Sequence, residues 1–162
     1  MDEVPTPSSS AASARLSRHP RRDTSPEMAL RRALHAAGCR YRVQWRTDII
    51  PRRSIDIAFP GRRVAVFVDG CYWHGCPIHG STPKSNSRWW SEKFARNRRR
   101  DADTDGQLRA AGWLVLRVWE HVQVEAAVAD VLRVLAEREH GPAAPVRHSS
   151  GDRADSVDDN GS

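Results

Sequence analysis

The spacing of apolar residues along the chain predicts alternating helices and strands. Helical spacing begins after the segment 23–27 and ends at Gly38, and it recurs over residues 87–111 and 122–139. Alternating or continuous apolar runs predict strands over residues 41–45, 54–59, 63–68 and 113–119. This order of helix, strands, helix, strand and helix favours an α/β fold, a sandwich in which helices flank a mixed sheet.

Local signals refine these elements. The first helix begins with either a Thr24–Glu27 capping box or a Ser25 cap followed by proline. The Pro-Gly turn at 60–61 predicts a hairpin, and the nearly continuous apolar runs on both sides of the long helix are typical of buried strands. The first helix is expected to bury Leu30, Ala33, Leu34 and Ala37. The last helix is expected to bury Val124, Val128, Val131, Leu132 and Leu135.

Composition separates a folded part from two ends. Residues 1–22 and 141–162 lack periodicity, which predicts a disordered basic arm and a disordered tail around one domain at 23–140. The net charge is +6 and the pI is about 10.0, so polyanions are natural partners. Solubility, or a compositional bias toward arginine, is the alternative explanation of this charge.

Cysteine usage and hydropathy bear on the compartment. Three cysteines, an odd number, argue against a disulfide framework and for a reducing environment. No run approaches the roughly 18 apolar residues of a membrane span, and the N-terminus lacks the apolar stretch of a signal peptide. We therefore expect a cytoplasmic protein without membrane contact.

Residues 69–79 read Asp-Gly-Cys-Tyr-Trp-His-Gly-Cys-Pro-Ile-His and concentrate several kinds of chemistry. Cys71, Cys76 and His79 have the ligand types and loop spacing of a tetrahedral Zn²⁺ site. His121 follows the strand 113–119 and would supply a fourth ligand if that strand pairs beside the loop. Such a site would be structural; a reduced cysteine pair beside a solvated histidine is the alternative.

Three further residues suggest catalysis. His74 lies between the ligands without being needed among them, so it fits a general acid or base, or else a fourth ligand or a plain loop histidine. Asp56 interrupts an apolar strand, and a buried carboxylate is costly unless it is paired or metal-bound, so it is a natural Mg²⁺ ligand. Asp69 ends the neighbouring strand and completes a coherent group, although either aspartate alone also fits an edge-strand or turn position.

The segment 84–100 combines positive charge with aromatic rings. Its basic residues are Lys84, Arg88, Lys93, Arg96, Arg98, Arg99 and Arg100. Trp89 and Trp90 are adjacent, and adjacent residues lie about 100° apart on a helix, so one ring is expected to serve outside the core. Charges for phosphates and rings for bases suit nucleic acid; a solvated helix face and core tryptophans are the alternative.

A series of ordered motifs runs from about residue 16 to residue 121. The motifs are Asp23–Glu27, Val66–His74, Thr82–Lys84, Trp90 with Lys93, Asn97, Arg100–Asp101, Ala111–Trp113 and Val118–Glu120. Together they resemble the very-short-patch-repair (Vsr) family of DNA mismatch endonucleases. The resemblance implies a restriction-endonuclease-like fold of the PD-(D/E)xK type, with catalytic Mg²⁺ and structural Zn²⁺. It also implies nicking of double-stranded DNA on the 5′ side of the T in a T:G mismatch, left by deamination of 5-methylcytosine.

The resemblance also implies catalytic roles for particular residues. Asp56 matches the catalytic metal-binding aspartate, and the backbone carbonyl of Val68 falls at the second Mg²⁺ ligand position. His74 matches the catalytic histidine, and Glu27 matches an acidic residue of the active-site region. Asp69 is counted with these catalytic residues, although relatives can carry histidine there, which puts its direct role in doubt.

The DNA-binding surface implied by the resemblance consists of Tyr72, Trp73, Trp90, Lys93 and Asn97. The three aromatic residues match a wedge that enters the duplex beside the mismatch. Wedge insertion costs a few kcal/mol of unstacking, least where pairing is already poor, which gives a physical route to mismatch preference.

Departures from the family pattern leave alternatives open. Relatives can carry cysteine where this chain has His121, a change that preserves a zinc-competent ligand, and Asp101 is expected to support the site rather than to bind metal. The resemblance implies a monomer at the nucleoid, with recruitment of mismatch-repair proteins left open. A nicking enzyme of the same fold with another DNA target, as in restriction or defence, and a non-catalytic zinc-stapled DNA-binding module are the alternatives.

Overall fold

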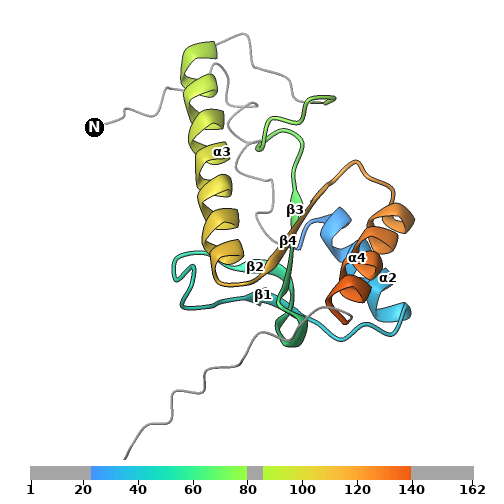
Figure 1. Ribbon diagram of the computed structural model, residues 1–162. Coiled ribbons are helices and arrows are strands. Elements are labelled where there is room, and N and C mark those ends of the chain that lie inside the picture. Colours follow the sequence, from blue (N-terminus) through green and yellow to red (C-terminus); the bar gives the residue numbers. More distant parts are fainter. Residues whose placement is uncertain (1–22, 80–85, 140–162) are drawn as a thin grey trace, which may run out of the picture.

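A four-stranded mixed sheet forms the centre of the computed structural model, which describes residues 23–79 and 86–139 (Figure 1). In spatial order its strands are β1 (Arg42–Trp45), β2 (Ile55–Phe59), β3 (Val64–Asp69) and β4 (Leu114–Trp119). The first three strands are antiparallel neighbours, and β4 runs parallel to β3. The mixed α/β class is confirmed, while the predicted arm, the predicted tail and the motif 82–84 lie outside the described residues.

Helices lie on both faces of this sheet (Figure 1). The helix α2 (Ser25–Ala36) packs beside α4 (Val124–Glu139), and the two share one core cluster with Ile57, Val64 and Val66 of the sheet. On the opposite face α3 (Ser87–Ala110) contributes Leu108 to a second cluster with Ile55, Ala65 and Phe67. The short helix η1 (Pro60–Arg62) closes the predicted hairpin between β2 and β3. Among these described helices, none has the length and apolar character needed to cross a membrane.

The start of α2 differs from the capping box that the sequence suggests. Thr24 is the N-cap residue, but its side chain makes no capping hydrogen bond. The expected partner, Glu27, is 4% exposed and forms an ion pair with Arg31, so it is turned inward and cannot reach back to the cap. The helix end is as predicted, because Gly38 adopts a φ of +81° that favours glycine.

Three expectations about burial are wrong. Ala37 is exposed, because α2 ends at Ala36 and Ala37 is the C-cap residue beyond it. The strand β4 lies at the sheet edge, with β3 as its neighbour, and most of its residues are only partly buried. In α4, Leu132 is 40% exposed, whereas Val134 is buried at 3%. The buried residues of α4 are Ala127, Val131, Val134 and Leu135, which follow the i, i+4, i+7, i+8 spacing of one helix face, and Leu132 lies one residue beyond that face.

This difference between helix faces predicts two different responses to truncation. Leu34 of α2 is 0% exposed, so Leu34→Ala should lower the free energy of unfolding by about 2–5 kcal/mol through lost burial and a residual cavity. Leu132→Ala removes the same atoms from an exposed position and should cost less than about 1 kcal/mol. Urea unfolding of both variants measures the difference, and equal losses would contradict the assigned core.

Candidate active site and metal centre

The carboxylate of Asp56 lies where the β2–β3 ladder ends. The last paired residues are Ile57 and Val66, and beyond them the Val68 N–H donates to Asp56 Oδ2 at 3.0 Å. The N–H and C=O of one strand residue point to the same side, so the Val68 carbonyl is directed toward the same gap as the carboxylate. This gap therefore brings together the two predicted Mg²⁺ ligands, both of them oxygen donors of the kind that Mg²⁺ takes.

A glutamine joins this gap to the first helix. Gln44 Nε2 donates to Asp56 Oδ1 at 3.3 Å and to Glu27 Oε1 at 3.1 Å. Burial raises the pKa of Asp56 to about 6, and the negative charge of Glu27 adds to this rise against the hydrogen bonds from Val68 and Gln44. A cation held between the oxygen donors would offset this cost, so the donor set and its electrostatics fit a divalent metal ion.

Asp69 belongs to a separate ion-pair network. Arg117 Nη1 donates to Asp69 Oδ1 at 2.8 Å, and the same guanidinium binds Asp105 Oδ1 at 2.9 Å through Nη2. Burial raises the pKa of Asp69, while the charges of Arg117 and His74 act in the opposite direction. The described side-chain contacts of Asp69 are thus with Arg117 and with His74.

His74 is held by Asp101. The distance from His74 Nδ1 to Asp101 Oδ2 is 2.6 Å, and Asp69 Oδ1 lies at 3.7 Å from the same nitrogen. Burial would raise the pKa of Asp101, but the hydrogen bond and the charge of His74 outweigh it, so the pKa lies below its ordinary value. Because the Asp101 carboxylate can only accept, His74 Nδ1 donates its proton to this bond. His74 Nε2 is therefore the ring atom that can exchange a proton with a reactant.

The predicted zinc ligands converge. The ligand atoms of Cys71, Cys76, His79 and His121 all lie within 4.8 Å of one another. Cys71 Sγ is 3.0 Å and Cys76 Sγ is 3.7 Å from His121 Nδ1. The ligands of a tetrahedral zinc site are about 3.3–3.8 Å apart, so small side-chain shifts would complete the geometry.

The electrostatics of this cluster also favour a cation. Desolvation and the neighbouring Cys76 raise the pKa of Cys71 to about 11, and a bound cation would favour the thiolate. The loop is closed by Cys76 N–H donating to Cys71 O at 3.0 Å, with Gly75 at a φ of +66°. Thiolate and imidazole donors in a closed set of this kind fit Zn²⁺.

The aromatic residues of the loop pack against the N-terminal half of α3, which extends past the sheet beside the loop (Figure 1). Tyr72 lies 5.5 Å from Trp90 and 5.9 Å from Phe94 between ring centroids. Trp90 is only 8% exposed, so of the adjacent pair it is the core ring, and Trp89 is the more open one. The wedge role of Trp90 stays a prediction, and it would need this cluster to open.

Two polar residues of α3 belong to the same region. Lys93 Nζ lies over the Trp89 ring, 4.6 Å from its centroid, and at 5.3 Å from the Trp73 ring. Asn97 Nδ2 donates to the Trp73 backbone carbonyl at 2.9 Å, which fixes the loop to the helix. Contact of either residue with DNA stays a prediction.

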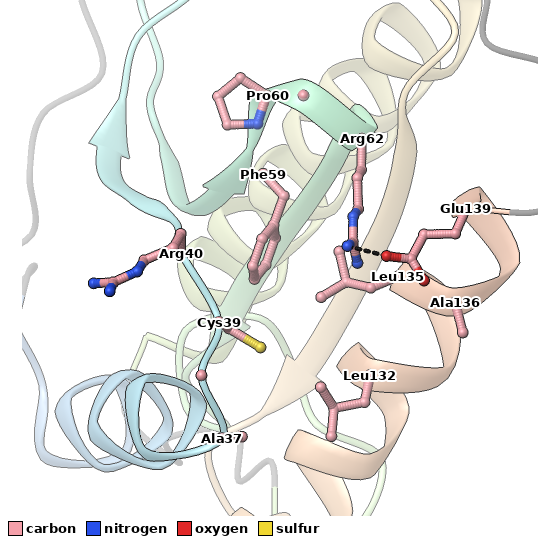
Figure 2. A pocket seen from close by; sticks show the side chains of 12 residues that line it. Ala37, Cys39, Arg40, Phe59, Pro60, Arg62, Leu132, Leu135, Ala136 and Glu139 are labelled. Atoms are coloured by element: carbon pink, nitrogen blue, oxygen red, sulfur yellow. Dashed lines mark hydrogen bonds and ion pairs between the residues drawn. The ribbon is translucent and has the colours of Figure 1, made fainter.

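A pocket of about 550 Å³ lies away from these groups, near the C-terminus of α4 (Figure 2). Phe59, Pro60, Leu132 and Leu135 line it, together with Arg62, whose guanidinium is paired with Glu139. The residues that form the two metal-competent groups are absent from its lining. The candidate site is therefore the group of residues at the end of β3, outside this pocket.

Several residues of the site were missed by sequence reasoning, namely Gln44, Ser54, Asp105 and Arg117. Polar residues in an alternating strand, such as Gln44, normally face solvent, so their spacing gave no signal. One signal was available for the ion pairs: Arg117 is a cation inside the apolar run of β4. A partly buried cation needs carboxylate partners.

Comparison with known proteins identifies the class. The family described as "DNA mismatch endonuclease Vsr" matches residues 6–79. The chain is 44% identical over 139 residues to the type II nicking enzyme V.NaeI of Lentzea aerocolonigenes, across 85% of this chain and 84% of that protein. It is 45% identical over 101 residues to the type II nicking enzyme V.XorIIP of Xanthomonas oryzae pv. oryzae, across 61% of this chain and 71% of that protein.

A more distant relative carries the family name itself. The DNA mismatch endonuclease Vsr of Escherichia coli strain K12 is 33% identical over 109 residues, across 61% of this chain and 62% of that protein. The α/β fold, the site at the end of β3 and these relatives define a DNA endonuclease. The chain belongs to the Vsr family.

The raised pKa of Asp56 predicts a pH-dependent stability. Its ordinary value of 3.8 applies to the unfolded chain and about 6 to the folded one, so the folded state retains the proton over the interval between them. Stability from Asp56 is therefore greatest below about pH 4 and is lost as the pH rises through about 6. In EDTA, the unfolding free energy of wild type minus that of Asp56→Asn should fall by about 2–3 kcal/mol from about pH 4 to pH 7.

Chemical unfolding at several pH values measures this difference, and subtracting the variant cancels the titration of groups that do not interact with Asp56. A difference that stays constant, or that grows with pH, would contradict the assigned burial of the ionised carboxylate.

Proposed function

We propose that this endonuclease nicks double-stranded DNA on the 5′ side of the T in a T:G mismatch, by Mg²⁺-dependent hydrolysis. The observation that carries the proposal is that the Asp56–Val68 gap and the His74–Asp101 pair lie at the same end of β3. The family membership and the E. coli relative named a mismatch endonuclease support it.

The mechanism assigns different tasks to the two groups. Asp56 and the Val68 carbonyl would hold Mg²⁺, which supplies charge stabilisation at the scissile phosphate and lowers the pKa of a bound water. Asp101 orients the His74 ring through Nδ1, and His74 Nε2 takes a proton from the attacking water or returns one to the leaving oxygen. Glu27 would add negative charge beside the metal ligands, to which Gln44 connects it. Asp69 would add negative charge beside His74.

Selectivity for a mismatch would come from the aromatic surface. Tyr72 and Trp73 present partly exposed rings from the loop, and Lys93 places a positive charge over neighbouring rings. Stacking by such rings is least costly where base pairing is already weak. The basic residues of α3 would hold the phosphate backbone, with binding that weakens as salt increases.

A structural zinc ion is the second part of the proposal. The ligands would be Cys71, Cys76, His79 and His121, and the ion would fix the loop that presents the rings and His74. No step of the reaction runs through this ion.

The names of two relatives favour a second candidate function. Both are called type II nicking enzymes, a name that specifies nicking but no mismatch. A nickase for another DNA target, working within restriction or defence, would use the same catalytic groups. The two functions differ only in the DNA that is cut, so comparing nicking of mismatched and matched duplexes distinguishes them.

The test of function is cleavage of a T:G duplex, of the matched T:A and C:G duplexes, and of varied flanking sequences. Wild type should nick the T:G strand with Mg²⁺ and leave it intact in EDTA, and it should prefer T:G over matched pairs. Asp56→Ala and His74→Ala should each lower the single-turnover rate by at least about 100-fold, through loss of a metal ligand and of the proton carrier.

Matched controls are Asp130→Ala and His35→Ala, which remove an exposed aspartate of α4 and an exposed histidine of α2. Both should nick at the wild-type rate. Wild-type rates in Asp56→Ala or His74→Ala would overturn the catalytic assignment, and equal nicking of matched duplexes would favour the second candidate.

Zinc analysis tests the structural ion. The purified protein should contain stoichiometric zinc, and His121→Ala should lose most of it along with thermal stability, because a ligand is removed. His121→Cys should retain zinc, since thiolate is an equivalent ligand. A zinc-free wild type, or full retention in His121→Ala, would rule out the proposed ligand set.

A further inference from the structure

Gln44 adopts an unusual backbone conformation inside a strand. Its φ is +46°, in the left-handed region that a residue with a long side chain rarely occupies. On either side of it, Val43 pairs with Ile57 and Trp45 pairs with Ile55. The strain is therefore confined to Gln44, opposite Asp56, and the flanking pairs hold it in place.

All polar groups of the Gln44 side chain are used. Nε2 donates to Asp56 Oδ1 at 3.3 Å and to Glu27 Oε1 at 3.1 Å, and Oε1 accepts from Ser54 Oγ at 3.0 Å. Two ionised carboxylates only accept hydrogen bonds, so the amide nitrogen must face them and the carbonyl must face the hydroxyl. The contacts thus define a single orientation of the amide.

These contacts fix the Asp56 carboxylate from two sides. Gln44 of β1 occupies Oδ1, and the Val68 N–H of β3 occupies Oδ2. Alternation along β2 is also interrupted here, because Ile57 joins the core cluster of α2 and α4 while Ile55 joins the opposite cluster. The irregular backbone at this point directs Asp56 into the gap between strands, where a regular strand would point it to one face.

We infer that Gln44 is a positioning residue that orients Asp56, and joins it to Glu27, for binding of the catalytic divalent cation. The inference rests on the proposed Mg²⁺-dependent function. The amide bridges two carboxylates that would otherwise repel each other, and it leaves each of them lone pairs for a cation. Outer contacts of this kind commonly alter metal affinity by about 10–100-fold when they are removed.

The decisive variant is Gln44→Met in the full-length protein, which keeps the length of the side chain and removes its hydrogen bonds. Calorimetric titration with Mg²⁺ alone should give a dissociation constant weakened by about 10–100-fold. The Mg²⁺ concentration for half-maximal nicking should rise by a similar factor, while affinity for T:G duplex in EDTA stays at the wild-type value. Ser54→Ala, which removes only the hydroxyl that orients the amide, should shift both metal readouts in the same direction by a smaller factor.

The matched control is Gln107→Met, since Gln107 also donates to a carboxylate, that of Asp103, but at an exposed position of α3. It should leave Mg²⁺ binding and nicking unchanged. If Gln44→Met lowers the melting temperature but binds Mg²⁺ as wild type does, the role is structural and the inference is overturned. If Gln44→Met does not fold, an unchanged Mg²⁺ affinity in Ser54→Ala overturns it.

The same experiment separates this inference from the proposed function. A wild-type protein that neither binds Mg²⁺ nor nicks any duplex overturns both. A wild-type protein that nicks with Mg²⁺, beside a Gln44→Met variant with the same Mg²⁺ dependence, overturns the role of Gln44 alone.

Discussion

The parallel pairing of β3 with β4 is the constraint on which the cysteine–histidine cluster and the ion pairs around His74 depend. Asp69 lies opposite Trp119 at the end of this pair, so Cys71 and His121, each two residues further along, emerge side by side. The pairing continues past the strands, because Glu120 N–H donates to Asp69 O and the Glu120 carboxylate accepts from Cys71 N–H. A shift of one residue in this register would separate the sulfur from the imidazole and would turn Asp69 away from Arg117.

The cationic side chain of Arg117 is the second element that depends on this register. It lies over the Phe67 ring, 4.8 Å from the centroid, and its guanidinium binds Asp69 through Nη1 and Asp105 through Nη2. Three carboxylates, with Asp101 at 3.8 Å, are therefore grouped around one partly buried charge. Removing that charge would leave acidic groups repelling each other around His74, so the geometry of the histidine depends on β4 and α3 together.

The sequence predicted the elements well because buried faces repeat with the period of a helix or a strand. It also predicted that Cys71, Cys76 and His79 form one cluster, because these residue types are rare and close together in the chain. Zinc binding by this cluster stays a proposal. Sequence reasoning failed where the deciding contacts join distant residues. Gln44 looked like a solvent-facing strand residue, and a positive φ is not encoded in the identity of glutamine. Arg117 meets Asp69 across a separation of 48 residues, which no local pattern carries. Leu132 lies one residue beyond the buried face of α4, and the choice of buried face is a tertiary property.

The Asp56 carboxylate, the proposed metal ligand, and the aromatic surface are supported by different parts of the fold. Asp56 is anchored by neighbouring strands, whereas the loop that bears Tyr72 and Trp73 lacks helix and strand structure and is held by ring contacts, Asn97 and the cysteine–histidine cluster. The sheet therefore holds Asp56, whereas the loop carries both His74 and the rings that would meet the bases. Because the two supports meet only at the end of β3, substitutions on the loop can change the DNA target without disturbing Asp56. This separation gives a physical reason why one family includes both a mismatch endonuclease and enzymes named simply for nicking.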